Sequence, residues 1–364
     1  MKIRGDQEEF LNGIQYVQNA VSHRASLPIL SHLLIKAQDG KVTFSGTDLE
    51  VGVTCPMKLV IEEEGGMTLP AKKFSDIVHE LPEAEVAMHA KKNNMVSIEC
   101  GKAFFRIAGL PMEEFPKFPS FGEREILSLS QKLFQEMLRK TSFAMSFDQT
   151  RYVLNGVFFK VEGTRLTLVA TDGRRLALVE KELEHPSRES VEMIVPTKAT
   201  QELNRLLTEE GTLKIFKKEN QALFDLGKAS LVTRLVEGEY PNYQQVIPTE
   251  SGEKVQIGRE NLLMATRRAS LLTTQESQSI KLDLLKDKLV VSKSSAEVGE
   301  AREELEAQYH GEEFSIGFNP QYLIDGLKNI EEEDIHIELG GPEKPGVIRT
   351  KDRFIYIVLP MQVA

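Results

Sequence analysis

Apolar residues along the chain follow two spacings, one typical of amphipathic helices and one typical of β-strands. Near the N-terminus, four apolar residues fall at intervals of three and four, namely Phe10, Ile14, Val17 and Val21. Two later apolar runs, 33–37 and 42–46, lie on either side of an Asp39-Gly40 turn, which predicts a pair of strands. The N-terminal pattern therefore predicts a helix followed by a hairpin.

The segment 151–179 has a strong strand pattern. Apolar residues alternate through 165–171, and a second apolar run begins at Leu176. Asp172-Gly173 between the two runs predicts a tight hairpin, because glycine tolerates positive φ. Arg174 and Arg175 follow the turn directly. Two cations entering a strand indicate either an exposed polar face or a recognition site, and the pattern alone favours the polar face.

The same plan occurs three times along the chain. The string 41–48, which ends in Thr-Asp, resembles 165–172 at a distance of 124 residues. Segments 69–77 and 195–203 are 126 residues apart, and Phe115-Pro116 precedes Tyr240-Pro241 by 125. A weaker third copy is visible in 288–295, 317–327 and 354–361. Because several landmarks keep one spacing, we interpret them as an internal repeat.

Each repeat of about 120 residues contains two predicted helices and several strands. We therefore predict an α+β fold of three similar domains, each with two helices against antiparallel sheets, and boundaries at 1–122, 127–250 and 252–364. The predicted helix windows are 8–24, 69–81, 129–140, 195–207, 258–272 and 317–330. A segment with three prolines, 110–121, is predicted to link the first two domains.

The composition of the chain is typical of a globular protein without membrane helices. The 364 residues are 41% hydrophobic, and the longest apolar runs fall short of the roughly 20 residues that a membrane helix needs. The N-terminus lacks an apolar export signal, and Cys55 and Cys100 have no metal-type or redox-type spacing. We therefore expect a cytoplasmic protein with free thiols and no membrane partner.

The helices carry a charge that differs from that of the whole chain. The net charge is −10, whereas the six helix windows together carry +4. The basic candidates on these helices are Lys72, Lys73, Lys132, Arg139, Lys140, Lys198, Arg205, Arg259, Arg267 and Arg268. Cations gathered on equivalent helices inside an acidic chain could contact phosphates without distinguishing bases. Ordinary exposed helix cations are the alternative interpretation.

Signatures of catalysis are scarce in the sequence. It contains no phosphate-binding Gly-rich loop, no Gly-x-Ser-x-Gly turn and no histidine pair at metal-ligand spacing. Asp48 and Asp172 occupy matching repeat positions, and they are either paired acids or turn residues that bond their own backbone. We favour the turn interpretation, and we predict no enzyme activity, no cofactor and no metal.

Three α+β repeats with these strings resemble the bacterial sliding clamps, the β subunits of DNA polymerase III. The resemblance covers the whole chain. Its most specific strings are Leu27-Pro-Ile-Leu30, Gly46-Thr-Asp-Leu-Glu50, Arg151-Tyr-Val-Leu-Asn-Gly156, Ala170-Thr-Asp-Gly-Arg-Arg-Leu176, Tyr240-Pro-Asn-Tyr243 and Leu359-Pro-Met361. The family forms a head-to-tail homodimeric ring of six similar domains around duplex DNA, with helices lining the hole and sheets outside.

The resemblance also implies a pocket between the second and third domains for a short peptide with Gln and Leu or Phe anchors. Apolar walls would bury the anchors, and nearby polar groups would fix the Gln. The matching residues are Leu154, Thr171, Gly173, Arg174, Arg175, Leu176, Pro241, Val246, Val358, Leu359, Pro360 and Met361.

Further residues match family positions for DNA and for ring closure. For DNA these are Arg24, Gln149 and Lys198. For the dimer seam they are Phe105 and Ile107 on one side and Leu271 and Leu272 on the other. The implied partners are duplex DNA, bound independently of sequence, the polymerase III catalytic subunit, an ATP-using clamp loader, and translesion and repair proteins with a clamp-binding peptide.

Two rival hypotheses remain at this stage. One is an enzyme with a cleft between repeats that uses Asp48 or Asp172. The other is a monomeric scaffold that binds peptides without DNA. The clamp hypothesis changes the interpretation of Arg174-Arg175, because the first repeat has Leu49-Glu50 after its Thr-Asp and the third has no Gly-Arg-Arg. The pair is then a feature of the middle repeat at the rim of the peptide pocket.

Overall fold

The computed structural model describes residues 1–22, 27–91, 93–122, 125–249, 252–295 and 297–362. The chain divides into two compact units. Unit 1 comprises Met1–Gln135 and Lys198–Leu235, and unit 2 comprises Glu136–Thr197 and Val236–Ala364. Within the described residues, every strand pairing in the three sheets is antiparallel, as the repeat pattern predicted.

Unit 1 contains a five-stranded sheet in the order β5-β1-β7-β8-β9. Its strands are β1 (Lys2–Asp6), β5 (Val60–Glu63), β7 (Glu85–Ala90), β8 (Met95–Cys100) and β9 (Ala103–Ala108). β9 is an edge strand of this sheet, and its side chains are mostly exposed.

The second sheet of unit 1 has eight strands in the order β10-β15-β16-β17-β4-β3-β2-β6. Its strands are β2 (His32–Gln38), β3 (Lys41–Thr47), β4 (Val51–Met57), β6 (Gly65–Pro70), β10 (Leu127–Ser130), β15 (Thr212–Lys218), β16 (Gln221–Asp225) and β17 (Ser230–Arg234). β4 of the first repeat pairs directly with β17 of the second, with Val51 opposite Thr233. One sheet therefore crosses the boundary between repeats.

Unit 2 contains a twelve-stranded sheet in the order β14-β11-β12-β13-β25-β24-β23-β18-β21-β20-β19-β22. Its strands from the second repeat are β11 (Gly156–Glu162), β12 (Arg165–Thr171), β13 (Arg175–Glu182) and β14 (Val191–Pro196). Those from the third are β18 (Glu253–Gly258), β19 (Ile280–Leu285), β20 (Lys288–Ser295), β21 (Gly299–Gln308), β22 (Phe314–Phe318), β23 (Asp334–Leu339), β24 (Gly346–Arg349) and β25 (Phe354–Val358). Here β13 pairs with β25, with Arg175 opposite Val358.

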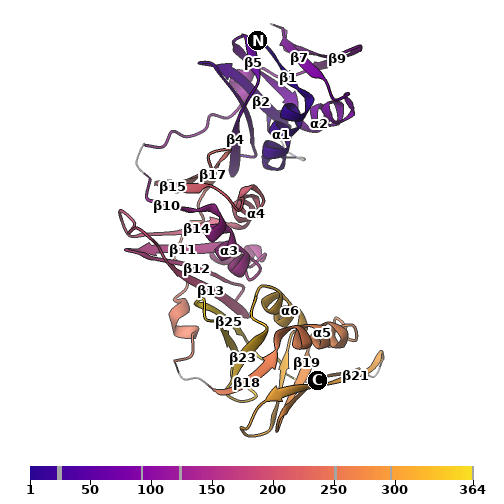
Figure 1. The fold of residues 1–364 in the computed structure, drawn as a ribbon, viewed down its shortest axis with the longest axis vertical. Helices are drawn as coiled ribbons and strands as arrows, with labels where there is room; N and C mark the ends of the chain where they lie inside the picture. Colours follow the sequence, from indigo (N-terminus) through magenta and orange to yellow (C-terminus); the bar gives the residue numbers. More distant parts are fainter. Residues whose placement is uncertain (23–26, 92, 123–124, 250–251, 296, 363–364) are drawn as a thin grey trace. The chain divides into compact units, whose positions relative to one another are not determined.

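The α-helices lie against these sheets and bury one face each (Figure 1). They are α1 (Gln7–Val17), α2 (Ala71–Glu80), α3 (Gln131–Ser142), α4 (Thr197–Leu206), α5 (Arg259–Ser270) and α6 (Pro320–Lys328). Short 3₁₀ segments are η1 (Gln18–Ala20), η2 (Pro28–Ser31), η3 (Met112–Glu114), η4 (Gln149–Leu154) and η5 (Tyr243–Val246). On α1, Phe10, Ile14 and Val17 are buried as their spacing predicted, and the Phe10 ring lies 6.2 Å from that of Phe44.

The structure confirms the α+β class and corrects several element bounds. Each α-helix follows a short strand almost directly, as β1 precedes α1 and β10 precedes α3. These strands bury only a few side chains each, so their signal in the sequence is weak. Five predicted helix windows accordingly begin too early, because their first residues belong to β6, β10, β14, β18 and β22. These windows are 69–81, 129–140, 195–207, 258–272 and 317–330.

The predicted domain boundaries remain a prediction. The compact units divide the middle repeat, because its strands belong to two different sheets. β10 and β15 to β17 lie in the sheet of unit 1, whereas β11 to β14 lie in the sheet of unit 2.

A glycine on α6 makes close packing of this helix against β25 possible. A Cβ atom at Gly326 would lie 2.3 Å from Cε1 of Tyr356, a fully buried ring. We expect Gly326→Ala to lower the free energy of unfolding by about 1–2 kcal/mol, because overpacking outweighs the gain in helix propensity of about 1 kcal/mol. Urea denaturation measures the change. Gly122→Ala, where no atom would lie within 4 Å, is the control and should be nearly neutral.

Candidate functional site

The turn between β12 and β13 is held by hydrogen bonds from two side chains. Oδ1 of Asp172 accepts hydrogen bonds from the backbone N–H groups of Arg174 and Arg175 at 2.9 and 3.0 Å. Oγ1 of Thr171 accepts from the Gly173 N–H at 3.0 Å and donates to the Arg175 carbonyl at 2.6 Å. Gly173 has a φ of +85°, which glycine adopts at little cost.

The first repeat contains the same turn between β3 and β4. Oδ1 of Asp48 accepts hydrogen bonds from the N–H groups of Glu50 and Val51 at 3.0 and 2.8 Å. Oγ1 of Thr47 accepts from Leu49 and donates to Val51. The interpretation of Asp48 and Asp172 as turn residues that bond their own backbone is confirmed.

The side chain of Arg175 is directed into the protein, and only 10% of its area is exposed. Its Nη1 donates to Oδ2 of Asp325 on α6 at 2.6 Å, and its Nη2 donates to the Phe143 carbonyl at 2.7 Å. Its Nε donates to Oδ2 of Asp172 at 3.1 Å, so the same carboxylate holds both the turn and the guanidinium. The guanidinium carbon lies 4.6 Å from the ring centre of Tyr322, a cation–π contact.

These partners keep Arg175 charged despite its burial. Burial acts to lower the pKa of Arg175, but Tyr356, Asp325 and Asp172 together outweigh it, so the pKa is raised. Arg175 therefore connects the β12–β13 turn to α6 as a buried cation. Of the two arginines at the turn, only Arg174 has an exposed side chain.

The exposed rim of this site lies where β13 and the end of β25 run side by side. The N–H of Leu359 donates to the carbonyl of Arg174 at 2.9 Å, which continues the ladder one residue past β25. Leu359 is 39% exposed. A cation and an apolar side chain thus occupy neighbouring backbone positions at the rim.

An apolar cluster lies beneath the rim. Its buried members are Phe158, Val169, Leu176, Leu178, Ile194, Val347 and Ile357. Tyr240 stacks on Phe158 with ring centres 4.8 Å apart, and Tyr243 lies 6.0 Å from the same ring. The chain segment that follows β17 is held against the cluster by these two aromatic side chains.

The structure brings part of the predicted pocket together. Thr171, Gly173, Arg174, Leu176, Val358 and Leu359 meet where β13 pairs with β25. Pro241 and Val246 are exposed and belong to the segment that Tyr240 and Tyr243 attach to the cluster. Leu154 is buried at the end of η4. Pro360 and Met361 are half-buried, and the Met361 N–H donates to the carbonyl of Gly317 at 2.8 Å.

Three residues at the site were absent from the sequence-based selection. Arg151 donates from Nη1 to the Asp172 carbonyl at 3.3 Å, and a Cβ atom at Gly173 would lie 2.6 Å from this nitrogen. Gly173 therefore also leaves room for Arg151. Tyr240 and Tyr243 are the other two. All three lie in strings that carry the family resemblance, but their contacts depend on the tertiary fold.

The residues predicted for DNA contact have different surroundings. Arg24 lies outside the described residues. Gln149 is exposed at the start of η4. Lys198, on α4, forms an ion pair through Nζ with Oδ2 of Asp48, so its charge is largely compensated within the protein.

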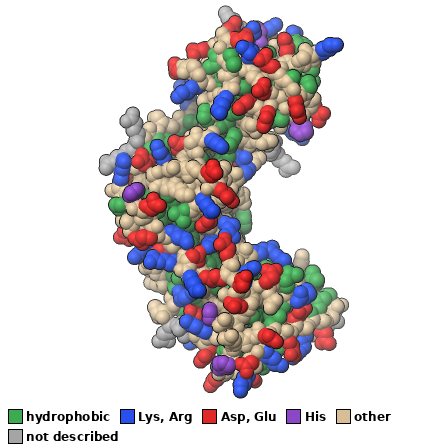
Figure 2. Space-filling view, in the orientation of Figure 1, with side chains coloured by type: hydrophobic (Ala, Val, Ile, Leu, Met, Phe, Trp, Pro, Cys, Tyr) green, Lys and Arg blue, Asp and Glu red, His purple; other side chains and the backbone are tan. Residues whose placement is uncertain are grey.

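Several other helix cations are compensated in the same way. Arg139 pairs with Glu331, Lys140 with Asp352, Arg205 with Glu202, Arg259 with Glu260 and Arg268 with Glu303. Among the described residues, Lys72, Lys73, Lys132 and Arg267 form no ion pair. On the face drawn in Figure 2, basic and acidic side chains are interspersed over both units. Among the helix cations, free positive charge is therefore confined to a few positions.

The residues predicted for ring closure lie at exposed edges. Phe105 and Ile107 belong to the edge strand β9, where Phe105 is exposed and Ile107 half-exposed. Leu271 follows α5 directly and is 78% exposed, which is unusual for a leucine, and Leu272 is half-buried. β21 pairs with β18 only through Ala307 and Gln308, so its 299–306 segment is unpaired on that side.

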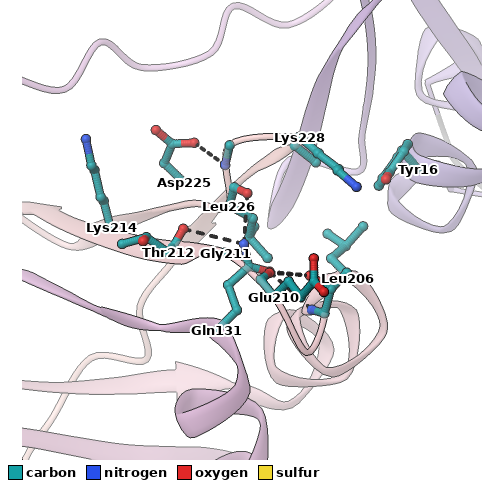
Figure 3. A pocket seen from close by; sticks show the side chains of 13 residues that line it. Tyr16, Gln131, Leu206, Glu210, Gly211, Thr212, Lys214, Asp225, Leu226 and Lys228 are labelled. Carbon is teal, nitrogen blue, oxygen red and sulfur yellow. Dashed lines mark hydrogen bonds between the residues drawn. The ribbon is translucent and has the colours of Figure 1, made fainter.

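A cavity of about 490 Å³ lies within unit 1, between the end of α1, the end of α4 and the loops of β15 to β17 (Figure 3). Two of its polar side chains form hydrogen bonds within the protein. Asp225 accepts from the Gly227 N–H, and Gln131 donates to the carbonyl of Leu226 and accepts from the N–H of Thr208. The described residues contain no group of three or more His, Cys, Asp or Glu side chains placed to hold a metal. Among the described residues, no helix is long and apolar enough to cross a membrane.

Sequence-family models match almost the whole chain. Residues 1–119 match the N-terminal domain of the DNA polymerase III beta subunit, residues 128–242 its central domain and residues 244–362 its C-terminal domain. The beta sliding clamp of Bacillus subtilis is 32% identical over 376 residues that cover all of both chains. That of Chlamydia muridarum is 31% identical over 363 residues, covering 100% of this chain and 99% of the relative.

Solved structures give the same result. The sliding clamp of Bacillus subtilis superposes with a TM-score of 0.96 at 32% identity, over 100% of each chain. A sliding clamp from Bartonella birtlesii bound to griselimycin superposes with a TM-score of 0.93 at 33% identity, again over 100% of each chain. The chain thus belongs to the DNA polymerase III beta-subunit family, the beta sliding clamps that act in DNA replication.

Proposed function

We propose that the chain forms a head-to-tail homodimeric ring around duplex DNA, where it makes the replicative polymerase processive. The main support is the match of three successive beta-subunit domains over the length of the chain. Two chains supply the six domains that the family places around DNA. Tethering would raise the effective concentration of a polymerase at the primer end without chemistry of its own. The protein therefore acts as a binding protein and not as an enzyme.

Ring closure would join different edges of two copies. β9 presents exposed Phe104 and Phe105 together with Arg106, whereas the free segment of β21 carries four glutamates and one arginine. Opposite charge on two unpaired edges favours a heterologous contact. In this arrangement Phe105 and Ile107 pack against Leu271 and Leu272 of the other copy, which covers apolar side chains and removes exposed sheet edges.

DNA contact would be weak and independent of sequence. The uncompensated helix cations Lys72, Lys73, Lys132 and Arg267 are the candidates that the ion-pair pattern favours. Arg24 and Gln149 are further candidates by family resemblance. Lys198 contributes less while it is paired with Asp48. A few phosphate contacts suffice if the ring is held by topology, and few contacts permit sliding.

Partner peptides would bind at the β13–β25 rim. The apolar cluster around Leu176 would provide walls for Leu or Phe anchors, together with the exposed side chains of Leu359 and Val246. Arg174 and Thr171 provide polar groups beside them. The partners are the polymerase III catalytic subunit, an ATP-using clamp loader, and translesion and repair proteins, all acting on the chromosome in the cytoplasm.

Loading the protein onto DNA tests the proposed function most directly. We expect protein loaded onto nicked circular DNA by a bacterial clamp loader to stay bound at about 0.5 M salt, where contacts to phosphates alone are weak. Linearising the DNA should release it from the ends, as gel filtration of the complexes measures. Protein that never loads, or that stays on linear DNA, would contradict the ring.

The two arginines at the β12–β13 turn should differ in their roles. We expect Arg174→Ala to weaken binding of a Gln-Leu-Phe-containing peptide several-fold and to leave stability unchanged, because its side chain is exposed. Arg175→Ala should lower the free energy of unfolding by roughly 2–4 kcal/mol, because it leaves Asp172 and Asp325 without their cation in a largely buried position. Peptide fluorescence anisotropy and urea denaturation separate the effects. Equal effects of both variants on stability would refute this division.

The seam can be tested with one leucine. We expect Leu271→Asp to weaken dimerisation by about 2 kcal/mol or more, because it places a carboxylate where a leucine would be buried. Sedimentation velocity over a concentration series measures the dissociation constant. Leu49→Asp, at a leucine that is also exposed but lies in the β3–β4 turn, is the matched control and should leave the dimer intact. A wild-type protein that is monomeric at micromolar concentration would refute the dimer itself.

A further inference from the structure

A groove of about 300 Å³ lies where the first two repeats join, wholly within unit 1. Strands β4 and β17, the β3–β4 turn and the 116–119 segment line it. We propose that this β4–β17 groove binds a short peptide that carries a Leu or Phe side chain next to acidic residues. The proposal takes the β13–β25 peptide site as its template and in that respect rests on the proposed function.

The backbone of the groove repeats that of the β13–β25 site. The N–H of Arg234 donates to the carbonyl of Glu50 at 3.0 Å, as the N–H of Leu359 donates to that of Arg174 at 2.9 Å. In both sites a Thr-Asp pair holds the turn through the same hydrogen bonds. The internal repeat has therefore produced two sites of one backbone geometry, with different side chains.

Leu49 is an unusual residue for its position in the turn. It has a φ of +80°, close to the +85° of the equivalent Gly173, although leucine disfavours this region. Its side chain lines the groove and is 52% exposed. A strained backbone that presents an apolar side chain to solvent at the mouth of a groove points to a function for that side chain.

The opposite wall is apolar and is fixed in place. A Cβ atom at Gly52 would lie 2.1 Å from Cε1 of Phe118, so only glycine lets this ring lie against β4. The ring centre of Phe118 lies 6.4 Å from that of the buried Phe115. Pro116 and Val232 complete the apolar surface. A cavity at the low end of the usual range of about 300–1,000 Å³ accommodates one or two side chains of a peptide.

Charges at the mouth favour an acidic occupant. Lys117 and Arg234 are exposed, and neither forms an ion pair with any residue that the structure describes. Glu50 is a lining carboxylate, and the nearby Asp48 is compensated by Lys198. Arg234 occupies the position of Leu359 in the other site. The groove should therefore prefer a peptide that has carboxylates beside its apolar anchor. The β13–β25 rim has a leucine at the position of Arg234 and should not share this preference.

The test uses two fluorescein-labelled peptides and the full-length protein. The acidic probe is Asp-Leu-Phe-Asp, and the neutral probe contains Gln, Leu and Phe without acids. We expect the acidic probe to bind Leu359→Asp protein as it binds wild type. The double variant Lys117→Glu, Arg234→Glu should weaken this binding at least about fivefold at about 50 mM salt. The conservative variant Lys117→Arg, Arg234→Lys should retain it.

Matched controls separate this proposal from the proposed function. Lys254→Glu with Lys286→Glu changes the net charge equally, at two exposed residues outside the groove, and it should leave binding of the acidic probe unchanged. The groove proposal would be overturned if Leu359→Asp abolished binding of the acidic probe. It would also be overturned if both charge-reversal variants weakened that binding equally. Binding of the neutral probe should be lost in the Leu359→Asp variant and retained in the double variant Lys117→Glu, Arg234→Glu. If Leu359→Asp protein still binds the neutral probe, the proposed β13–β25 peptide site is wrong, whatever the result with the acidic probe.

Discussion

The pairing of strands across repeat boundaries is the constraint on which the rest of the structure depends. A strand at the edge of a sheet exposes unpaired N–H and C=O groups, which must be paired or protected. β4 pairs with β17 and β13 pairs with β25, so two sheets run continuously from one repeat into the next. Each junction also leaves a turn and the end of a neighbouring strand side by side. The candidate binding sites lie at these junctions because the pairing creates them.

Buried charge fixes the second junction. Arg175 is held by Asp172 of its own turn, by Asp325 on α6 and by the carbonyl of Phe143. A buried cation with this many partners specifies one arrangement, since a shifted turn would leave at least one carboxylate unpaired. The first junction has an ion pair between Lys198 and Asp48, in which the Lys198 side chain is 39% exposed. At the second junction, groups that are largely buried therefore position the rim that would meet a partner.

Repetition explains why two sites share a backbone and differ in chemistry. The Thr-Asp turn is local, so the first and second copies both form it regardless of their neighbours. The residues after the Thr-Asp pair are free to change, and Leu49-Glu50 in one copy corresponds to Gly173-Arg174 in the other. The segments that follow the first two repeats also differ in sequence. Phe118 packs against the sheet at one junction, and Tyr243 packs against it at the other.

The sequence by itself determined the repeat, the α+β class, the helices and the Thr-Asp turns, because these depend on periodicity and on hydrogen bonds between near neighbours. It also carried the family strings that selected Arg174 and Leu359. It did not determine that Arg175 is directed inward, that Lys198 pairs with Asp48, or that Arg151 lies beside Gly173. Those side chains meet partners 21 to 150 residues away, and only the paired sheets decide which distant residues become neighbours.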